Sequence, residues 1–292
     1  MSAYYKIVKN TKTIPFLRFF DKSSLTIKLI LINVAIFFFF LITEMIVRYY
    51  NFSLIPFFAL QAQNLFEKAY IWTLITSIFM HNGLPHLLVN MLTLYFLGSF
   101  LEMIIGKKRY FWFYILSGIF SGLFFAFLAY YFGVGLGEKI FGSASVMDVG
   151  ASGALFGIAG VLAVLTPRKK VYLILGPIVA FVLIEIVSVL LKGSLLVPVL
   201  TLVLAAYAII SITSIFFLRN SGAERISLAL EIPFWAIPLV AIVPLVIIGL
   251  FFDLPIGNMA HLGGFIIGFF YGLYLRLRYK KKTQRIAEYF SH

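Results

Sequence analysis

The apolar residues of this chain are gathered into eight long stretches, and this feature restricts its fold more than any other. A transmembrane helix needs roughly 20 mostly apolar residues, with a range of about 17–25. An open strand in lipid would leave its backbone polar groups without hydrogen bonds, so each stretch is predicted to be a helix. The stretches cover residues 27–47, 86–105, 110–132, 152–166, 171–191, 195–217, 233–252 and 259–277.

The overall composition agrees with a membrane protein that crosses the bilayer several times. Hydrophobic residues make up 62% of the 292 positions and charged residues 12%, whereas soluble domains have about 45–50% and about 25%. The net charge of +13 does not indicate a nucleic-acid partner, because the basic residues form short clusters between the apolar stretches. The absence of cysteine excludes disulfides and thiolate metal sites. We therefore expect the lipid bilayer as a partner, and no nucleic acid.

The positions of the basic residues predict the orientation of the chain. Lys and Arg in short loops favour the cytoplasmic side of a membrane. With a cytoplasmic N-terminus and eight spans, only four of the 24 Lys and Arg residues fall on the other side: Arg48, Lys68, Lys139 and Lys192. We expect one domain over residues 1–292, with a cytoplasmic segment at 1–26, a basic cytoplasmic tail at 278–292, and both termini cytoplasmic. The segment 48–85 is too polar to span and is expected at the membrane interface.

Polar side chains inside a membrane are costly and mark functional sites by default. Ser152 and His261 each stand at the start of a stretch that runs inward from the non-cytoplasmic side, and His81, His86 and Asn90 lie at the start of another. A serine hydroxyl becomes a nucleophile when a neighbouring imidazole takes its proton. The Asn90 amide, the His86 ring and the Ser152 backbone N–H are the candidate donors to an oxyanion. These are the parts that acyl transfer requires, in a site opening to the non-cytoplasmic side.

Glycines at a spacing of four residues predict how this site is assembled. Gly153 and Gly157 form one ridge, and Gly264, Gly268 and Gly272 form another. Ridges of small residues allow helices in membranes to approach closely. Packing the two ridges together would bring Ser152 next to His261, under a roof formed by residues 133–150.

These motifs resemble those of the rhomboid family of intramembrane serine proteases. The matching pieces are Gly-Ala-Ser-Gly at 150–153, Ala-His-Leu-Gly-Gly-Phe-Ile-Ile-Gly at 260–268, and His81, His86 and Asn90 at the family's spacing. Trp72 is followed by Thr73, where many members have arginine. The resemblance implies an all-α membrane helix bundle with a six-helix core. Because 109 residues separate Ser152 from His261, we expect two additional helices between them.

The resemblance also implies a role for each matching residue. Ser152 would be the nucleophile, His261 the general base, and His86 and Asn90 part of the oxyanion hole. His81 and Glu102 would have structural roles, and Gly150 with the two glycine ridges would shape the site. No metal, no cofactor and no third catalytic carboxylate are implied. The implied substrates are single-pass membrane proteins, cut in or near their transmembrane segments.

Two other functions remain open from the sequence. The first is an inactive relative of this family that binds membrane clients without cutting them, although the presence of both Ser152 and His261 argues against it. A transporter would place further acidic or histidine residues deep within the other spans and would show internal repeats. Taken singly, Ser152 and His261 are each explained by packing or by a local hydrogen bond. Asp253 is a further candidate to orient His261.

Overall fold

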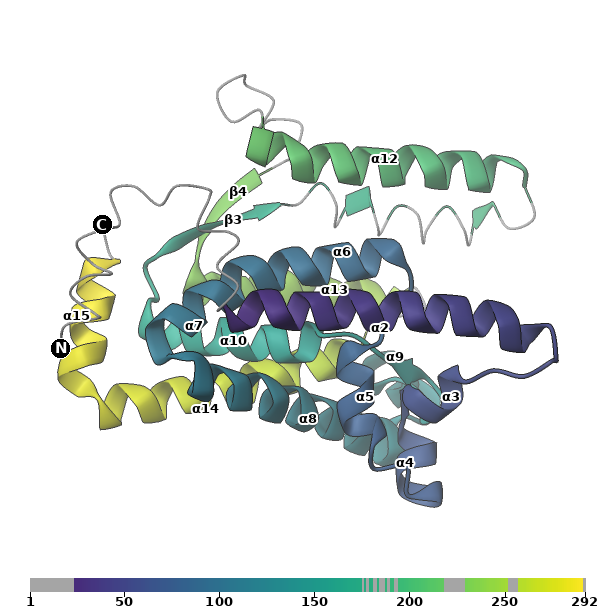
Figure 1. The fold of residues 1–292 in the computed structure, drawn as a ribbon, viewed down its shortest axis with the longest axis horizontal. Coiled ribbons are helices and arrows are strands. Elements are labelled where there is room, and N and C mark those ends of the chain that lie inside the picture. Colours follow the sequence, from purple (N-terminus) through teal and green to yellow (C-terminus); the bar gives the residue numbers. More distant parts are fainter. Residues whose placement is uncertain are drawn as a thin grey trace.

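The computed structural model describes residues 24–174, 194–217, 229–251 and 257–290, together with scattered positions between 175 and 193. The fold is mostly helical (Figure 1). Among the described residues, four helical segments are long and apolar enough to cross a membrane: α2 (Leu25–Arg48), the continuous segment Leu84–Ile105, α8 (Lys107–Phe132) and α14 (Asn258–Arg278). The second segment consists of α6 (Leu84–Thr93), the π-helical turn η2 (Leu94–Gly98) and α7 (Ser99–Ile105). The predicted multi-pass helical membrane fold is confirmed.

Two shorter apolar helices pack in the bundle: α10 (Ser152–Leu165) and α13 (Ile237–Phe251), which follows the 3₁₀ turn η5 (Phe234–Ala236). Helix α12 (Leu196–Phe217) has 22 residues. Helix α10 is buried along almost its whole length, because its side chains pack against neighbouring helices on all sides. A helix that is apolar all round is typical of such a central position. Ser152 therefore begins the central helix of the bundle.

The prediction of a helix beginning at residue 171 is wrong. Residues Lys170–Ile174 form strand β3, which pairs antiparallel with strand β4 (Ala229–Pro233). The β-branched and aromatic residues of β3 suit a strand, and β4 supplies the backbone hydrogen bonds that an isolated strand would lack. Hydrophobicity alone does not distinguish a short strand from a helix. Asp253 and much of 175–193 lie outside the described residues.

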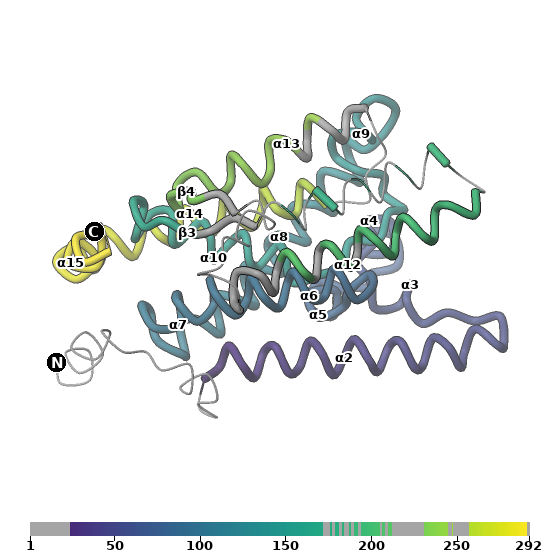
Figure 2. Tube along the Cα trace, turned by 90° about the horizontal axis from the view of Figure 1, so that it is seen from above, coloured from purple at the N-terminus to yellow at the C-terminus, as the bar shows by residue number. Residues whose placement is uncertain are grey.

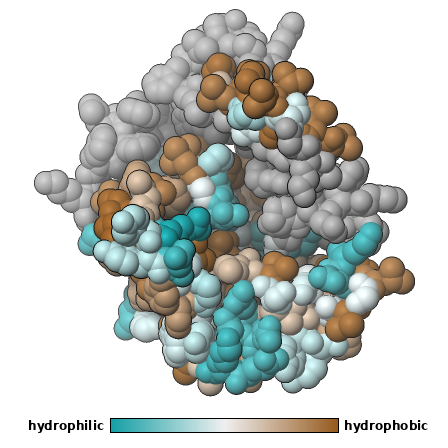
Figure 3. All heavy atoms as spheres, turned by 90° about the vertical axis from the view of Figure 1, so that its right-hand side faces the viewer, coloured by the Kyte–Doolittle hydropathy of each residue, from teal (hydrophilic) through white to brown (hydrophobic). Residues whose placement is uncertain are grey.

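The segment 48–85 forms short elements and no spanning helix, as its polar residues predict. It contains α3 (Ile55–Phe58), β1 (Leu60–Gln61), α4 (Ala62–Lys68) and α5 (Thr73–Phe79). Strand β1 pairs with β2 (Met147–Asp148), which immediately precedes the Ser152 motif. The 3₁₀ turn η3 (Gly135–Gly137) and α9 (Glu138–Phe141) lie in the same loop as β2. Two segments that are distant in sequence are therefore joined at one end of the bundle, where hydrophilic side chains gather (Figure 3).

The opposite end of the bundle carries the C-terminal helix. Helix α15 (Lys280–Tyr289) follows α14 after a sharp bend and runs across the end of the bundle, as Figures 1 and 2 both show. The ends of α7, α10 and α14 and the start of α8 are at this side of the molecule (Figure 1). The predicted basic tail is therefore a folded helix packed on the bundle.

Candidate active site

Ser152 and His261 meet at the starts of two packed helices. Ser152 is the first residue of α10, and His261 is the fourth residue of α14. The Ser152 Oγ atom lies 2.9 Å from the His261 Nε2 atom. Hydrogen-bond reach between a nucleophile and its base is about 2.6–3.2 Å. The two residues predicted from sequence are thus in direct contact, although 109 positions separate them.

The glycine ridges bring the two helices together, as predicted. A Cβ atom built on Gly264 would lie 2.0 Å from the Gly153 carbonyl oxygen, and one on Gly268 would lie 2.0 Å from that of Gly157. Only glycine allows backbones to approach this closely. Helix α8 fixes the same junction, because the Ser121 hydroxyl donates to the Ala260 carbonyl oxygen at 2.6 Å. Ala260 directly precedes His261, so α8 holds the start of α14 in place.

The His261 imidazole is held by an aromatic ring that the sequence analysis did not single out. The Phe156 ring stacks on it, with 4.4 Å between centroids and 22° between planes. Phe156 stands four residues after Ser152, so both face the same side of α10. Its spacing of four residues from Ser152 is the sequence signal that could have identified Phe156. The His261 Nδ1 atom is buried and has no hydrogen-bond partner within the described part of the chain, so packing against Phe156 orients the ring.

His86 and Asn90 face the backbone of Gly150 from α6. A Cβ atom at Gly150 would lie 2.9 Å from the His86 Nε2 atom and 3.5 Å from the Asn90 Nδ2 atom. Gly150 also has a φ of +128°, a conformation that residues with side chains rarely adopt. Two independent reasons therefore require glycine two residues before Ser152.

The hydrogen bonds around His86 identify which of its ring atoms faces the site. The Asn82 backbone N–H donates to the His86 Nδ1 atom at 3.4 Å. In a neutral imidazole the other nitrogen then carries the proton. The His86 Nε2–H group is therefore a donor directed at Gly150.

Asn90 supplies a second donor to the same place. Its side chain is only 4% exposed, and its Nδ2 atom has no hydrogen-bond partner in the part of the chain that the structure describes. A buried donor without an acceptor costs about 1–3 kcal/mol. The Ser152 backbone N–H, at the first position of α10, is a third donor, since such groups have no acceptor within their own helix. The site thus has three N–H donors, on His86, Asn90 and the Ser152 backbone, and the first two are directed at Gly150.

The loop before Ser152 is fixed by bonds to segment 48–85. The Gly150 N–H donates to the Ser77 carbonyl oxygen at 2.9 Å, and the Gln63 N–H donates to the Ala144 carbonyl oxygen at 2.9 Å. Together with the β1–β2 pairing, these bonds set the path of the chain into α10. The expected covering loop 133–150 is thus tied to α4 and α5.

His81 and Glu102 are placed as supporting residues. The His81 ring meets the His86 ring edge to face, with 5.2 Å between centroids. Burial, and then the neighbouring His86, lower the pKa of His81 to about 3, so this ring is neutral at physiological pH. The Glu102 carboxylate accepts hydrogen bonds from the Leu25 and Thr26 N–H groups, at 3.0 and 2.9 Å. Glu102 therefore caps the start of α2 and takes no part in the contacts around Ser152.

The residues described by the structure contain no cluster of three His, Cys, Asp or Glu side chains with metal-binding geometry. The His81 and His86 rings contact each other directly. The groups at the site are therefore a hydroxyl, imidazoles, an amide and backbone N–H donors.

Comparison with known proteins places Ser152, His86 and Asn90 within a recognised domain. Residues 68–201 match the family described as Rhomboid domain. This match contains Ser152, His86 and Asn90 and ends before His261, so the geometry of α14 supplies the fourth member of the site.

Three relatives illustrate the similarity. RHOMBOID-like protein 1 of Arabidopsis thaliana is 38% identical over 104 residues, which are 36% of this chain and 23% of the relative. The putative rhomboid protease YdcA of Bacillus subtilis is 34% identical over 90 residues, which are 31% of this chain and 39% of the relative. Inactive RHOMBOID-like protein 8 of Arabidopsis thaliana is 41% identical over 58 residues, 20% of this chain and 16% of the relative. The aligned segments span at most 39% of the length of these three relatives. The chain contains a rhomboid domain, matched over residues 68–201.

Proposed function

We propose that this chain is an intramembrane serine endopeptidase that uses Ser152 and His261 as a catalytic dyad. The observation that carries the proposal is the 2.9 Å contact between the Ser152 Oγ and His261 Nε2 atoms. The match of residues 68–201 to the Rhomboid domain family and the similarity to a putative rhomboid protease support it.

The chemistry follows from the positions of the donors and acceptors. The Ser152 oxygen attacks the carbonyl carbon of a peptide bond while its proton passes to the His261 Nε2 atom. The Asn90 amide, the His86 Nε2–H group and the Ser152 N–H stabilise the oxyanion that forms. His261 then gives the proton to the leaving amine, and the peptide bond breaks. A water molecule, deprotonated by His261, hydrolyses the acyl-enzyme and restores the serine hydroxyl.

The substrates in this proposal are single-pass membrane proteins cut in or near their transmembrane segments. The site lies among helices long and apolar enough to span a bilayer, so a substrate helix reaches it from the membrane. Most basic residues of the described loops are at the opposite end of the bundle, around α15. Because such residues favour the cytoplasm, the site opens to the non-cytoplasmic side.

Labelling with a fluorophosphonate probe in detergent tests the nucleophile. The probe phosphonylates an activated serine, so we expect labelling of the wild-type chain and none of Ser152→Ala or His261→Ala. Ser145→Ala is the matched control, since Ser145 is an exposed serine near the same end of the bundle whose hydroxyl bonds to that of Ser143 and whose backbone carbonyl accepts from Gln61. Equal labelling of wild type and Ser152→Ala would refute the assignment.

One relative carries the word inactive in its name, so a client-binding protein without proteolysis is the alternative. The same experiment separates the two functions. A wild-type chain that is folded but never labels, and that leaves single-pass substrates intact in liposomes, would favour client binding.

A further inference from the structure

Helix α15 is fixed to the end of the bundle that lies away from Ser152. Thr283 and Ile286 are buried, at 6% and 2% exposure. Near its start, the Arg109 guanidinium donates to the Tyr279 hydroxyl at 2.9 Å. These contacts make α15 a docked helix that runs across the bundle, perpendicular in direction to α14 (Figure 1).

The far end of α15 is fixed by a cation between two rings. The Lys169 Nζ atom lies 4.1 Å from the centre of the Phe100 ring and 4.2 Å from that of the Phe290 ring. The two rings meet edge to face, with 4.9 Å between centroids. Cation–π contacts of this kind favour a defined arrangement. Both ends of α15 are therefore held against α7, α8 and the end of α10.

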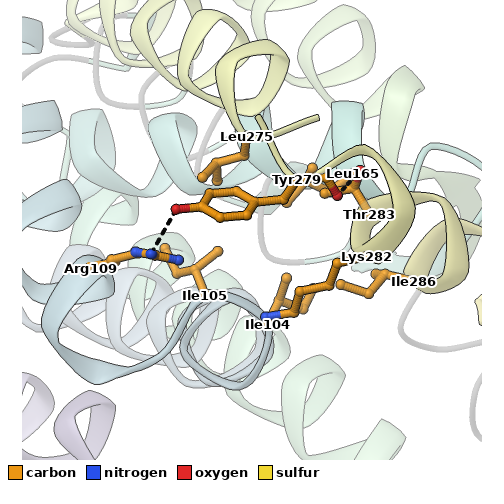
Figure 4. Close-up of a pocket in the computed structure, with 9 residues that line it drawn as sticks. All are labelled: Ile104, Ile105, Arg109, Leu165, Leu275, Tyr279, Lys282, Thr283 and Ile286. Atoms are coloured by element: carbon orange, nitrogen blue, oxygen red, sulfur yellow. Dashed lines mark hydrogen bonds between the residues drawn. The ribbon is translucent and has the colours of Figure 1, made fainter. Parts of the chain in front are cut away.

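A small cleft lies where α15 packs against the bundle. One wall is apolar, and the polar side chains of Arg109, Tyr279, Lys282 and Thr283 line the remainder (Figure 4). The apolar residues of the lining are Ile104, Ile105, Leu165, Leu275 and Ile286. The cleft therefore offers two cationic side chains next to a hydrocarbon surface.

The surroundings of the cleft are strongly basic. The elements that border it, the start of α8, the end of α14 and α15, carry further exposed Lys and Arg residues: Lys107, Lys108, Arg276, Arg278, Lys280, Lys281 and Arg285. On the described part of α15 the acidic residue is Glu288 alone. A concentration of positive charge next to membrane-spanning helices attracts anionic lipid headgroups, with about 1 kcal/mol for each basic residue near the surface.

We propose that this cleft binds the headgroup of an anionic phospholipid. Arg109 and Lys282 bind the phosphate, and the glycerol and first acyl carbons cover the apolar wall formed by Ile104, Ile105 and Ile286. A free phosphate would leave that wall in contact with water, so the chemistry of the lining favours a lipid. Candidate spanning helices α8 and α14 form two sides of the cleft, and a bilayer lipid is therefore adjacent to it. This site is independent of the Ser152 chemistry.

Native mass spectrometry of the detergent-purified full chain tests the proposal. The protein is titrated with dioleoylphosphatidylglycerol or with dioleoylphosphatidylcholine, which have the same acyl chains and differ in net charge. We expect wild type to retain phosphatidylglycerol in preference to phosphatidylcholine. We expect Arg109→Gln/Lys282→Gln to bind phosphatidylglycerol about tenfold more weakly or worse, with unchanged binding of phosphatidylcholine.

Two controls separate the cleft from general charge effects. Lys68→Gln/Lys139→Gln removes the same charge from the opposite end of the bundle and should leave the preference intact. Tyr279→Phe removes the bond to Arg109 without removing charge and should keep most of the binding. The proposal is overturned if wild type does not distinguish the two lipids, if the cleft variant retains the preference, or if both double variants lose it equally.

Discussion

The closest backbone contact at the site leads to a specific test of how the dyad is assembled. The substitution is Gly264→Ala, which adds one methyl group between α10 and α14. The new Cβ would lie 2.0 Å from the Gly153 carbonyl oxygen and 2.9 Å from its carbonyl carbon. Both atoms belong to backbone and cannot rotate away, so the helices must move apart.

The distance by which α10 and α14 must separate can be calculated from the contact distances. Ordinary contacts of a Cβ atom begin near 3.4 Å, so the difference from 2.0 Å requires a separation of about 1.4 Å. The same displacement applied to the 2.9 Å distance between Ser152 and His261 gives about 4.3 Å, beyond hydrogen-bond reach. A misplacement of about 1 Å can lower a rate about 10²-fold. Overpacking of this kind typically costs about 1–3 kcal/mol of stability.

The assay is the rate of fluorophosphonate labelling, measured together with the thermal unfolding midpoint in the same detergent. Gly122→Ala is the control, because its Cβ would meet the terminal methyl of Leu60 at 2.8 Å, and a side-chain rotation relieves this contact. We expect Gly264→Ala to remain folded and to label about 10²-fold more slowly, while Gly122→Ala labels at close to the wild-type rate. A folded Gly264→Ala protein that labels as fast as wild type would show that the glycine contact does not set the dyad distance.

Three further substitutions test other parts of the molecule. Asn90→Ala removes a buried donor directed at Gly150 and should lower the rate of substrate cleavage about 10²–10³-fold with little change in folding; a rate within threefold of wild type would contradict its role. Glu102→Gln weakens the cap of α2 and should lower the unfolding midpoint, since hydrogen bonds to a charged group contribute about 1.5–3 kcal/mol, while the labelling rate of the folded fraction stays unchanged. Burial raises the pKa of Asp148 from 3.8 to about 7, so between these values the folded chain holds a proton that the unfolded chain releases, and stability falls as pH rises through this window. Asp148→Asn should therefore flatten the dependence of the unfolding midpoint on pH between 5 and 8, and a slope equal to that of wild type would refute this.

The long helices could be predicted from the sequence because lipid imposes both their length and their conformation. The stretch 27–47 corresponds to α2 at 25–48, and 259–277 corresponds to α14 at 258–278. The β3–β4 ribbon could not be predicted in the same way. Its strands are separated by more than 50 residues, and each is stabilised by the other. An apolar run of five residues carries no signal of such a partner.

The site was partly predictable for a different reason. Ser152 and His261 stand at the starts of helices whose glycine ridges match in spacing, so their contact follows from helix packing. Phe156 and Ser121 were missed because their contacts depend on side-chain conformation. Phe156 is one aromatic residue among 33 Phe, 16 Tyr and 3 Trp residues, and only its stacking on His261 distinguishes it.

The short length of α10 connects the unpredicted segments with the chemistry. Its 14 residues extend over roughly 21 Å, less than the roughly 30 Å of a hydrocarbon core, so a bundle with α10 at its centre has irregular backbone beside Ser152 at membrane depth. Such backbone is tolerated only where protein satisfies its polar groups. The bonds from Gly150 to Ser77 and from Gln63 to Ala144, with the β1–β2 pairing, do this here. The segments 48–85 and 133–150 therefore replace lipid around Ser152, as the proposed hydrolysis requires, because water has to reach the serine hydroxyl.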